Sequence, residues 1–333
     1  MTVETVVITG ASAGVGRATA RAFAKEGARI GLLARGAERL NATAAEVKEA
    51  GGEALVLPTD VADADAVEAA AAAVERAFGP IDIWVNNAMA TIFAPVSQIT
   101  PEEYRRATEV TYLGCVHGTM AALKRMRPRN RGAIVQVGSA LAYRAIPLQA
   151  PYCGAKHAIR GFTDSLRCEL MHENSDVHVT MVQMPALNTP QFDWARNKMG
   201  RKTRPMGTIY QPEVAAEAIL FAAHARRREV LVGGSTVEAV WGNKAAPGLL
   251  DHLLAWRAVD GQLTDEPADT EKPGNLFASV AGDCAAHGRF DALAKSSSTE
   301  LELQRQPGVA LAVGLGLAAG LAALLLAPRV AAR

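Results

Sequence analysis

Three side chains in the middle of the sequence have the types and spacing of a proton-transfer site. Tyr152 and Lys156 are four residues apart on a predicted helix, so they lie on one face of it. A nearby ammonium stabilises a phenolate and lowers the pKa of a tyrosine, which lets Tyr152 act as an acid or base near neutrality. Ser139 follows a predicted strand, at the sheet edge where open α/β folds bind ligands, and its hydroxyl is expected to hold a carbonyl oxygen. Taken alone, a Y-x-x-x-K pair also occurs by chance on many helices.

A glycine-rich turn follows the first predicted strand. Gly10, Gly14 and Gly16 are spaced G-x-x-x-G-x-G between that strand and a helix. Glycines let the backbone turn sharply and approach a pyrophosphate, and the free N–H groups of the helix start then face the anion. The alternative is a turn with a structural role only, but its place at the first strand–helix junction favours a dinucleotide site.

The end of the second predicted strand indicates which dinucleotide binds. Sites for NAD usually place an acidic residue there to bind the ribose 2′-hydroxyl. This chain has Ala34 and then Arg35. A guanidinium, joined by Ser12 and Arg17, forms charge-assisted hydrogen bonds with a 2′-phosphate, so NADP(H) is favoured over NAD(H). The alternative is that Arg35 is a solvated loop charge.

Alternating strand and helix patterns predict the scaffold that positions these groups. Short apolar runs typical of buried parallel strands occur at 6–9, 30–34, 54–58, 81–86, 133–137, 177–183 and 230–232. Helical patterns separate them at 16–26, 37–50, 64–78, 101–126, 152–172 and 212–225. We therefore expect an α/β fold over residues 1–240, with a doubly wound parallel sheet of about seven strands and helices on both faces.

Taken together, the motifs resemble in order and spacing the short-chain dehydrogenase/reductase (SDR) family. The matching elements are the turn from Thr9 to Gly16, Asp60-Val61, Asn86-Asn87-Ala88, Ser139 with Tyr152 and Lys156, and Pro185 with Thr189-Pro190. The resemblance covers about residues 1–240 and implies a Rossmann-type domain with a nicotinamide cofactor. The cofactor-binding residues expected from the motifs and the resemblance are Gly10, Ser12, Ala13, Gly14, Val15, Gly16, Arg17, Arg35, Asp60, Val61, Asn87, Ala88, Tyr152, Lys156, Pro185 and Thr189.

The resemblance also implies a role for each catalytic residue. Tyr152 exchanges a proton with an alcohol or carbonyl oxygen, and Ser139 hydrogen-bonds that oxygen. Lys156 binds the nicotinamide ribose and lowers the pKa of Tyr152. Hydride passes between the nicotinamide and the substrate carbon, and an NADP(H) site favours carbonyl reduction as the direction.

The sequence departs from the family pattern at three positions. Met89 and Ala186 each stand where the family usually has glycine. Thr111 stands where the family usually has an asparagine whose backbone carbonyl holds a water of the proton relay. Because a carbonyl does this work, we expect Thr111 to supply it and include it among the catalytic residues.

Composition excludes several other classes of function. The chain has 333 residues, of which 49% are apolar and 21% charged, and its formal net charge is +1, so global disorder and a general attraction to nucleic acid are excluded. Four cysteines without a CxxC pair and seven histidines without an HExxH motif predict no disulfide framework and no metal site. The N-terminal residues show no signal-peptide pattern, which predicts a cytoplasmic catalytic domain.

The C-terminal part differs in character. Residues 241–306 contain acidic, Ser- and Pro-rich stretches typical of an exposed extension and linker. Residues 308–327 carry no charged or polar side chain, and a helix of twenty residues spans about 30 Å, the thickness of a bilayer core. We expect a C-terminal apolar helix over 307–328 that anchors the protein in a membrane by a single pass. The alternative is a helix that docks on protein.

The substrate and the partners are less defined. Apolar residues after strand 177–183, together with the tail, predict a lipophilic ketone, aldehyde or alcohol; they are Met184, Leu187, Phe192, Trp194, Met199 and Met206. Basic residues in the same region predict a solvated flexible loop rather than an anion site; they are Arg196, Lys198, Arg201, Lys202 and Arg204. The resemblance implies a homo-oligomer, a dimer or tetramer, through the helices at 101–126 and 152–172. A catalytically silent NADP(H) sensor and a membrane-surface scaffold are the alternatives to an enzyme.

Overall fold

Seven parallel strands form the central sheet of the molecule. The structure is a computed structural model that describes residues 3–306 and 308. The strands are β1 (Thr5–Thr9), β2 (Arg29–Ala34), β3 (Glu53–Pro58), β4 (Ile83–Asn86), β6 (Ala133–Val137), β7 (His178–Gln183) and β12 (Glu229–Leu231). Their order in space is β12-β7-β6-β4-β1-β2-β3, so the chain winds outward in opposite directions from the β1–β4 pair. The predicted doubly wound sheet is confirmed, and ligands bind such sheets at the carboxyl ends of the strands beside this reversal.

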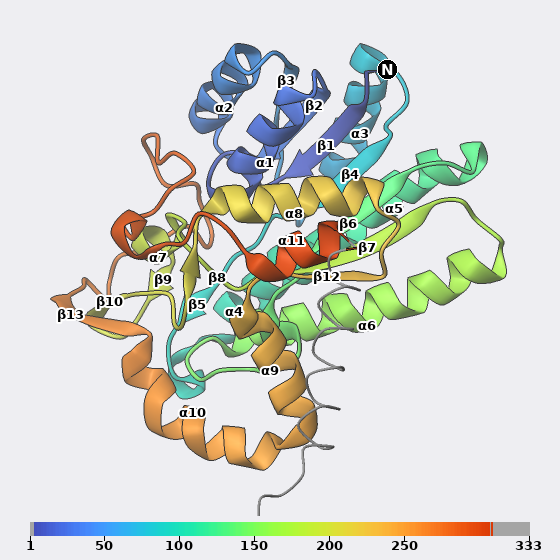
Figure 1. The fold of residues 1–333 in the computed structure, drawn as a ribbon. Helices are drawn as coiled ribbons and strands as arrows, with labels where there is room; N and C mark the ends of the chain where they lie inside the picture. Colours follow the sequence, from blue (N-terminus) through green and yellow to red (C-terminus); the bar gives the residue numbers. More distant parts are fainter. Residues whose placement is uncertain (1–2, 307, 309–333) are drawn as a thin grey trace, which may run out of the picture.

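Helices cover both faces of this sheet (Figure 1). On one face lie α1 (Gly14–Lys25), α2 (Ala37–Glu49) and α8 (Pro212–His224), and on the other lie α3 (Ala64–Phe78), α4 (Pro101–Thr108), α5 (Gly114–Met126) and α6 (Ala150–His172). The strands are apolar on both sides, as this arrangement requires. In β1, Val6 and Ile8 pack into one core and Val7 into the other, because successive side chains of a strand point to opposite faces.

Shorter elements gather beyond the carboxyl ends of the strands. They are β5 (Ile92–Phe93), β8 (Ala186–Leu187), α7 (Gln191–Trp194), β9 (Arg196–Asn197), β10 (Arg201–Thr203) and β11 (Ile209–Tyr210). They form two-stranded pairs, β5 with β9, β8 with β11, and β10 with a strand of the C-terminal extension. These pairs hold residues 184–210 over the edge of the sheet where the predicted site lies.

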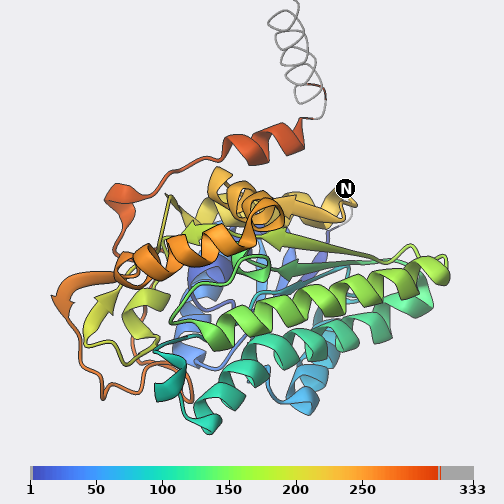
Figure 2. The ribbon, with the colours of Figure 1, turned by 90° about the horizontal axis from the view of Figure 1, so that it is seen from below.

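The extension is folded onto the rest of the chain, as Figures 1 and 2 show. It contains the last turn of α9 (Gly234–Ala245), followed by α10 (Pro247–Gly261), β13 (Leu263–Pro267) and α11 (Thr299–Arg305). β13 pairs antiparallel with β10, and the side chain of Gln304 in α11 bonds both backbone groups of Leu231 in β12. Most residues of 241–306 are exposed, as expected, but the segment also contains helices and a strand, so it is more than a connector. A few apolar side chains among many polar ones, such as Leu276 and Leu301, are almost fully buried and fasten the segment.

None of the helices within residues 3–306 is both long enough and apolar enough to cross a bilayer. Apart from Gly308, the predicted helix over 308–327 lies outside the described residues.

Candidate active site

Three of the four predicted catalytic residues, Ser139, Tyr152 and Lys156, line one cavity. Ser139 follows β6, whereas Tyr152 and Lys156 lie in the first two turns of α6. The cavity has a volume of about 410 Å³, and its exposed wall is mostly apolar. The Lys156 ammonium lies 5.4 Å from the centre of the Tyr152 ring. The structure thus brings together the residues that the sequence predicted to act together.

Two hydrogen bonds hold Ser139 in place. Its N–H donates to Oε1 of Gln183 at 2.8 Å, and its Oγ accepts from the N–H of Leu141 at 3.1 Å. The Gln183 amide is fully buried and in turn donates to Glu229 at 2.6 Å. The Ser139 oxygen accepts a backbone N–H, so its hydroxyl proton is still available to donate to an acceptor in the cavity.

The charges of Tyr152 and Lys156 are set by burial. Burial raises the pKa of the Tyr152 phenol well above its ordinary value, although a hydrogen bond with Ser139 lowers it. Burial lowers the pKa of Lys156 to about 8, and its ammonium donates to the carbonyl of Val137 at 2.6 Å. The expected lowering of the Tyr152 pKa by Lys156 is thus not seen here, because burial disfavours charge on both groups.

Thr111 lies in a widened turn that interrupts the helix predicted over 101–126. α4 is followed by a π-helical turn, η2 (Glu109–Leu113), and then by α5. The Thr111 hydroxyl accepts from the N–H of Ala90 and donates to its carbonyl, both at 3.0 Å. This pair ties the helix to the loop after β4. Single-turn π-bulges are frequent at functional sites, and the relay role of Thr111 stays a prediction.

A second cavity, here called the nucleotide cleft, lies over the glycine-rich turn. Gly10 adopts φ +68°, which favours glycine, and a Cβ on Gly16 would stand 2.2 Å from the Gly10 carbonyl oxygen. The turn is therefore packed as tightly as a pyrophosphate-binding turn requires. The predicted residues that line the cleft are Gly10, Ser12, Ala13, Gly14, Val15, Arg35, Asp60, Val61, Asn87, Ala88 and Thr189. Val15, Asn87 and Met89 line both cavities, so the two lie side by side.

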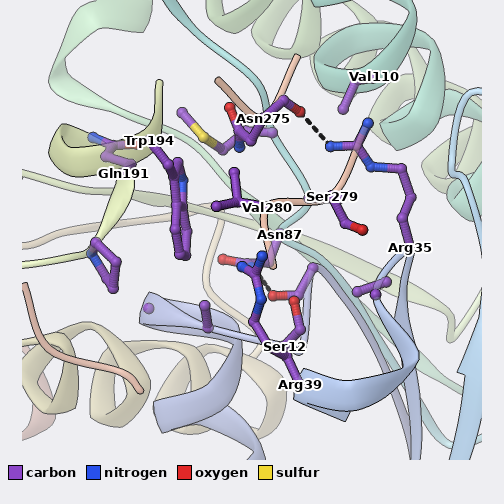
Figure 3. Close-up of a pocket in the computed structure, with 18 of the residues that line it drawn as sticks. Ser12, Arg35, Arg39, Asn87, Val110, Gln191, Trp194, Asn275, Ser279 and Val280 are labelled. Atoms are coloured by element: carbon purple, nitrogen blue, oxygen red, sulfur yellow. Dashed lines mark hydrogen bonds between the residues drawn. The ribbon is translucent and has the colours of Figure 1, made fainter. Parts of the chain in front are cut away.

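Guanidinium groups dominate the charge of this cleft (Figure 3). Arg35 and Arg39 line it, and Arg106 stands beside Asp60. Burial lowers the pKa of Arg35, and the neighbouring charge of Arg106 lowers it further. Arg39 is 6% exposed, and its Nη2 has no hydrogen-bond partner among the described residues. Three guanidinium groups around one carboxylate leave net positive charge here, which favours an anion.

More than half of the chain matches a family of known proteins. The model of the short chain dehydrogenase family matches residues 4–199. This chain belongs to that family. It is 33% identical to an uncharacterized oxidoreductase, YxnA, of Bacillus subtilis (strain 168), over 96% of this chain and 90% of that protein. It is also 31% identical to dehydrogenase/reductase SDR family member 7B of Bos taurus, over 76% and 81% of the two chains.

Solved structures of short-chain dehydrogenases share the fold. A metagenomic short-chain oxidoreductase in complex with NADP is 29% identical, with a TM-score of 0.58 over 69% of this chain and 96% of that chain. An alcohol dehydrogenase from the archaeon Thermococcus sibiricus, complexed with 5-hydroxy-NADP, is 27% identical with a TM-score of 0.59 over the same shares. The chain is therefore a member of the SDR oxidoreductase family. Proteins of similar structure have been solved as complexes with NADP and with 5-hydroxy-NADP.

Two predicted cofactor residues lie outside the lining of both cavities. Gly16 packs beneath the glycine-rich turn and shapes it. The Arg17 guanidinium is almost fully buried and binds Glu46 and Asp283. Burial alone would lower the pKa of Arg17, but these two carboxylates raise it. The structure therefore gives Arg17 a structural ion-pair role and does not bring it to Arg35. Pro185 lies beside Tyr152 and Lys156 in the first cavity.

The basic segment after α7 is pinned in place, against the expectation of a solvated loop. Arg196 and Lys198 both bind Glu103, at 3.1 and 2.7 Å. Arg201 binds Asp260 and Asp265 of the extension. These partners lie far away in the sequence, which is why the local charge pattern suggested solvation. Arg204 has no ion-pair partner among residues 3–306 and lines the first cavity.

Sequence reasoning missed the parts of the site that come from helix α2 and the extension. Arg39 lies only four residues after Arg35, and this short spacing could have indicated that both face the same cleft. Trp194 was expected at the substrate but lines the nucleotide cleft, where the guanidinium of Arg39 lies 4.8 Å from its ring centre. Other missed residues have no motif to mark them; they are Asn275, Ser279 and Val280 in the cleft, and Leu250 and Leu254 of α10 in the first cavity.

Proposed function

We propose that this protein is an NADP(H)-dependent carbonyl reductase that interconverts a lipophilic ketone or aldehyde and the corresponding alcohol. The observation that carries the proposal is the placement of Ser139, Tyr152 and Lys156 on a largely apolar cavity that shares lining residues with the nucleotide cleft. A bound nicotinamide supplies the hydride in such a site. The chain itself supplies the proton, the hydrogen bonds that orient the substrate oxygen, and an apolar wall that excludes water.

The acid–base chemistry follows from the positions of the side chains. Ser139 donates its hydroxyl proton in a hydrogen bond to the substrate oxygen and orients it. The raised pKa of Tyr152 keeps the phenol protonated at neutral pH, so it gives its proton to that oxygen as negative charge develops. The positively charged Lys156 ammonium lies 5.4 Å from the centre of the Tyr152 ring, and this charge favours the phenolate that remains after the proton has left.

Residues at the end of β2 and at the start of α2 support a preference for NADP(H) over NAD(H). β2 ends at Ala34 and is followed by Arg35, without the acidic residue that binds a free ribose 2′-hydroxyl. Arg39 adds a second guanidinium with a free donor. Two neighbours of known structure are complexes with NADP or a derivative of it.

Activity is expected to rise with the apolar size of the substrate. Each methylene that enters the cavity contributes about 0.8 kcal/mol, so KM is expected to fall by about fourfold per methylene along a series of 2-alkanones until the cavity is filled. The measurement is NADPH oxidation at each chain length. Equal kcat/KM values for long alkanones and for small hydroxylated ketones such as dihydroxyacetone would overturn the lipophilic assignment.

Carbonyl reduction is expected to lose activity above the pKa of Lys156, which is about 8. This pKa is lowered from its ordinary value, so the ammonium is charged below pH 8 and neutral above it. Because Tyr152 stays protonated over this range, kcat for reduction is expected to be level below about pH 7 and to fall by about tenfold per unit above pH 8. The control is Lys156→Arg, whose profile should stay level even where its absolute rate is lower. A parent profile that is level to pH 9.5 would contradict this role.

We also propose that two copies associate through α5 and α6. Large apolar side chains are exposed on these helices, namely Met120 at 61% and Met171 at 72%. The two helices lie side by side on one face of the sheet (Figure 2). Light scattering on the purified protein distinguishes a dimer or tetramer from a monomer, which would end this proposal.

Membrane attachment through residues 308–327 remains a proposal that rests on their composition. Flotation with phospholipid vesicles tests it directly, with the full chain compared with a chain that ends at residue 306. Equal recovery of both forms in the floating fraction would overturn it.

A further inference from the structure

We infer that residues 274–290, here called the strap, form the roof of the nucleotide cleft and control the entry and release of the cofactor. The inference rests on the proposed binding of a nicotinamide nucleotide in this cleft. The strap lies outside residues 4–199, which the family model matches, so it is an addition to the part that this chain shares with the family.

The strap faces the site where the anion is expected. Asn275, Ser279 and Val280 line the cleft together with Arg35 (Figure 3). The strap also approaches the cleft at Gly36, where an ideal Cβ would stand 3.4 Å from the Cβ of Ser279. The cleft therefore has walls from the glycine-rich turn and β2 on one side and from the strap on the other.

The first half of the strap is tied to the arginines of the cleft. Arg35 donates to the carbonyls of Asn275 and Leu276, and Arg106 donates to the carbonyl of Leu276 at 3.2 Å. The side chain of Leu276 is fully buried in the core that contains Val61. Arg35, which is proposed to bind the 2′-phosphate, thus also holds the strap in place. Binding of the phosphate is therefore coupled to the position of the strap.

The second half of the strap is tied to the glycine-rich turn itself. Asp283 forms an ion pair with Arg17, and the N–H of Gly14 donates to the carbonyl of Ala285 at 3.3 Å. Further along, the N–H of Gly288 donates to the carbonyl of Asn188 at 3.2 Å. These bonds join the strap to both sides of the cleft.

The strap narrows the nucleotide cleft. The cleft has a volume of about 180 Å³, less than half of the 410 Å³ of the cavity beside it. Gly274 and Gly282, at φ +64° and +79°, bracket the part that lines the cleft, and such residues absorb backbone rotation readily. The strap is therefore expected to swing outward when the cofactor enters and again when it leaves.

A reversible disulfide across the rim of the cleft tests this directly. Bonded cysteines have Cβ atoms about 3.5–4.5 Å apart, close to the 3.4 Å between Gly36 and Ser279. Gly36 has φ −88°, which any residue adopts, so Gly36→Cys is sterically allowed there. The two substitutions, Gly36→Cys and Ser279→Cys, are made in a full-length protein that also carries Cys284→Ser, because Cys284 lies in the strap and would compete for the bond.

The readout is the rate of NADPH exchange, followed by the fluorescence of the bound nucleotide. The oxidised protein is expected to bind NADPH at least about tenfold more slowly than the same protein after reduction. Protein oxidised after loading is expected to retain NADPH at least about tenfold longer. Thiol titration verifies that the disulfide has formed, and the two single-cysteine variants are the controls. Equal exchange rates with and without a verified disulfide would overturn the inference.

A second variant tests the same motion without an added bond. Asp283→Ala removes the strap's ion pair with Arg17 and is expected to speed NADPH dissociation by about threefold to tenfold. Asp265→Ala is the matched control, since it removes another exposed, arginine-paired carboxylate of the extension away from the cleft. Equal dissociation from the parent and from Asp283→Ala would contradict the role of the strap. Failure of the parent to bind NADPH at all would instead contradict the proposed function.

Discussion

Replacing Tyr152 by phenylalanine is expected to lower kcat for carbonyl reduction by about 10²–10⁴-fold, the usual contribution of a positioned general acid. Tyr152 lines the substrate cavity beside Ser139 and supplies the proton in the proposed reaction. Phenylalanine keeps the ring and its packing in the first turn of α6 but removes the proton. The NADPH dissociation constant is therefore expected to change by less than about threefold, since only the proton donor is lost.

The measurement is single-turnover NADPH oxidation with a saturating 2-alkanone, beside an equilibrium titration with NADPH. Tyr104→Phe is the matched control, because it removes a phenol hydroxyl from a half-exposed residue of α4 that lines neither cavity. Full activity of Tyr152→Phe would exclude Tyr152 as the acid. Loss of NADPH binding together with activity would show that Tyr152 acts through the cofactor instead.

The catalytic group could be predicted because regular structure sets its geometry. Tyr152 and Lys156 share a helix face at a spacing of four residues, and Ser139 follows a strand whose carboxyl end lies at the ligand edge of a parallel sheet. The charges of this group could not be predicted in the same way. The pKa of Tyr152 depends on how much water the cavity excludes, and that depends on residues contributed by the whole fold.

The remainder of the site depends on contacts between distant parts of the chain. Lys198 looked solvated because its partner, Glu103, lies 95 residues earlier. Residues 241–306 looked like a linker, because the few buried side chains that fasten them, such as Leu276, are diluted among polar ones. Composition averages over a segment, whereas packing is decided by individual side chains.

Substitution of Arg39 by glutamine is expected to weaken NADPH binding by about 10- to 100-fold, since hydrogen bonds to charged groups contribute about 1.5–3 kcal/mol. NADH binding should change by less than about threefold, because NADH carries no 2′-phosphate. Arg39 is a sharper test than Arg35. The Arg35 guanidinium already donates to the carbonyls of Asn275 and Leu276, so its loss would disturb the strap as well.

An acidic residue added at the end of β2 is expected to change the cofactor preference of the protein. Ala34→Asp combined with Arg39→Gln places a carboxylate where a ribose 2′-hydroxyl is bound and repels a 2′-phosphate. The ratio of the NADPH and NADH dissociation constants is expected to reverse in favour of NADH. Arg29→Gln is the control, because Arg29 is a cation at the opposite end of the same strand. Equal weakening of NADPH and NADH by Arg39→Gln would locate the role of Arg39 in its packing against Trp194, not in recognition of a phosphate.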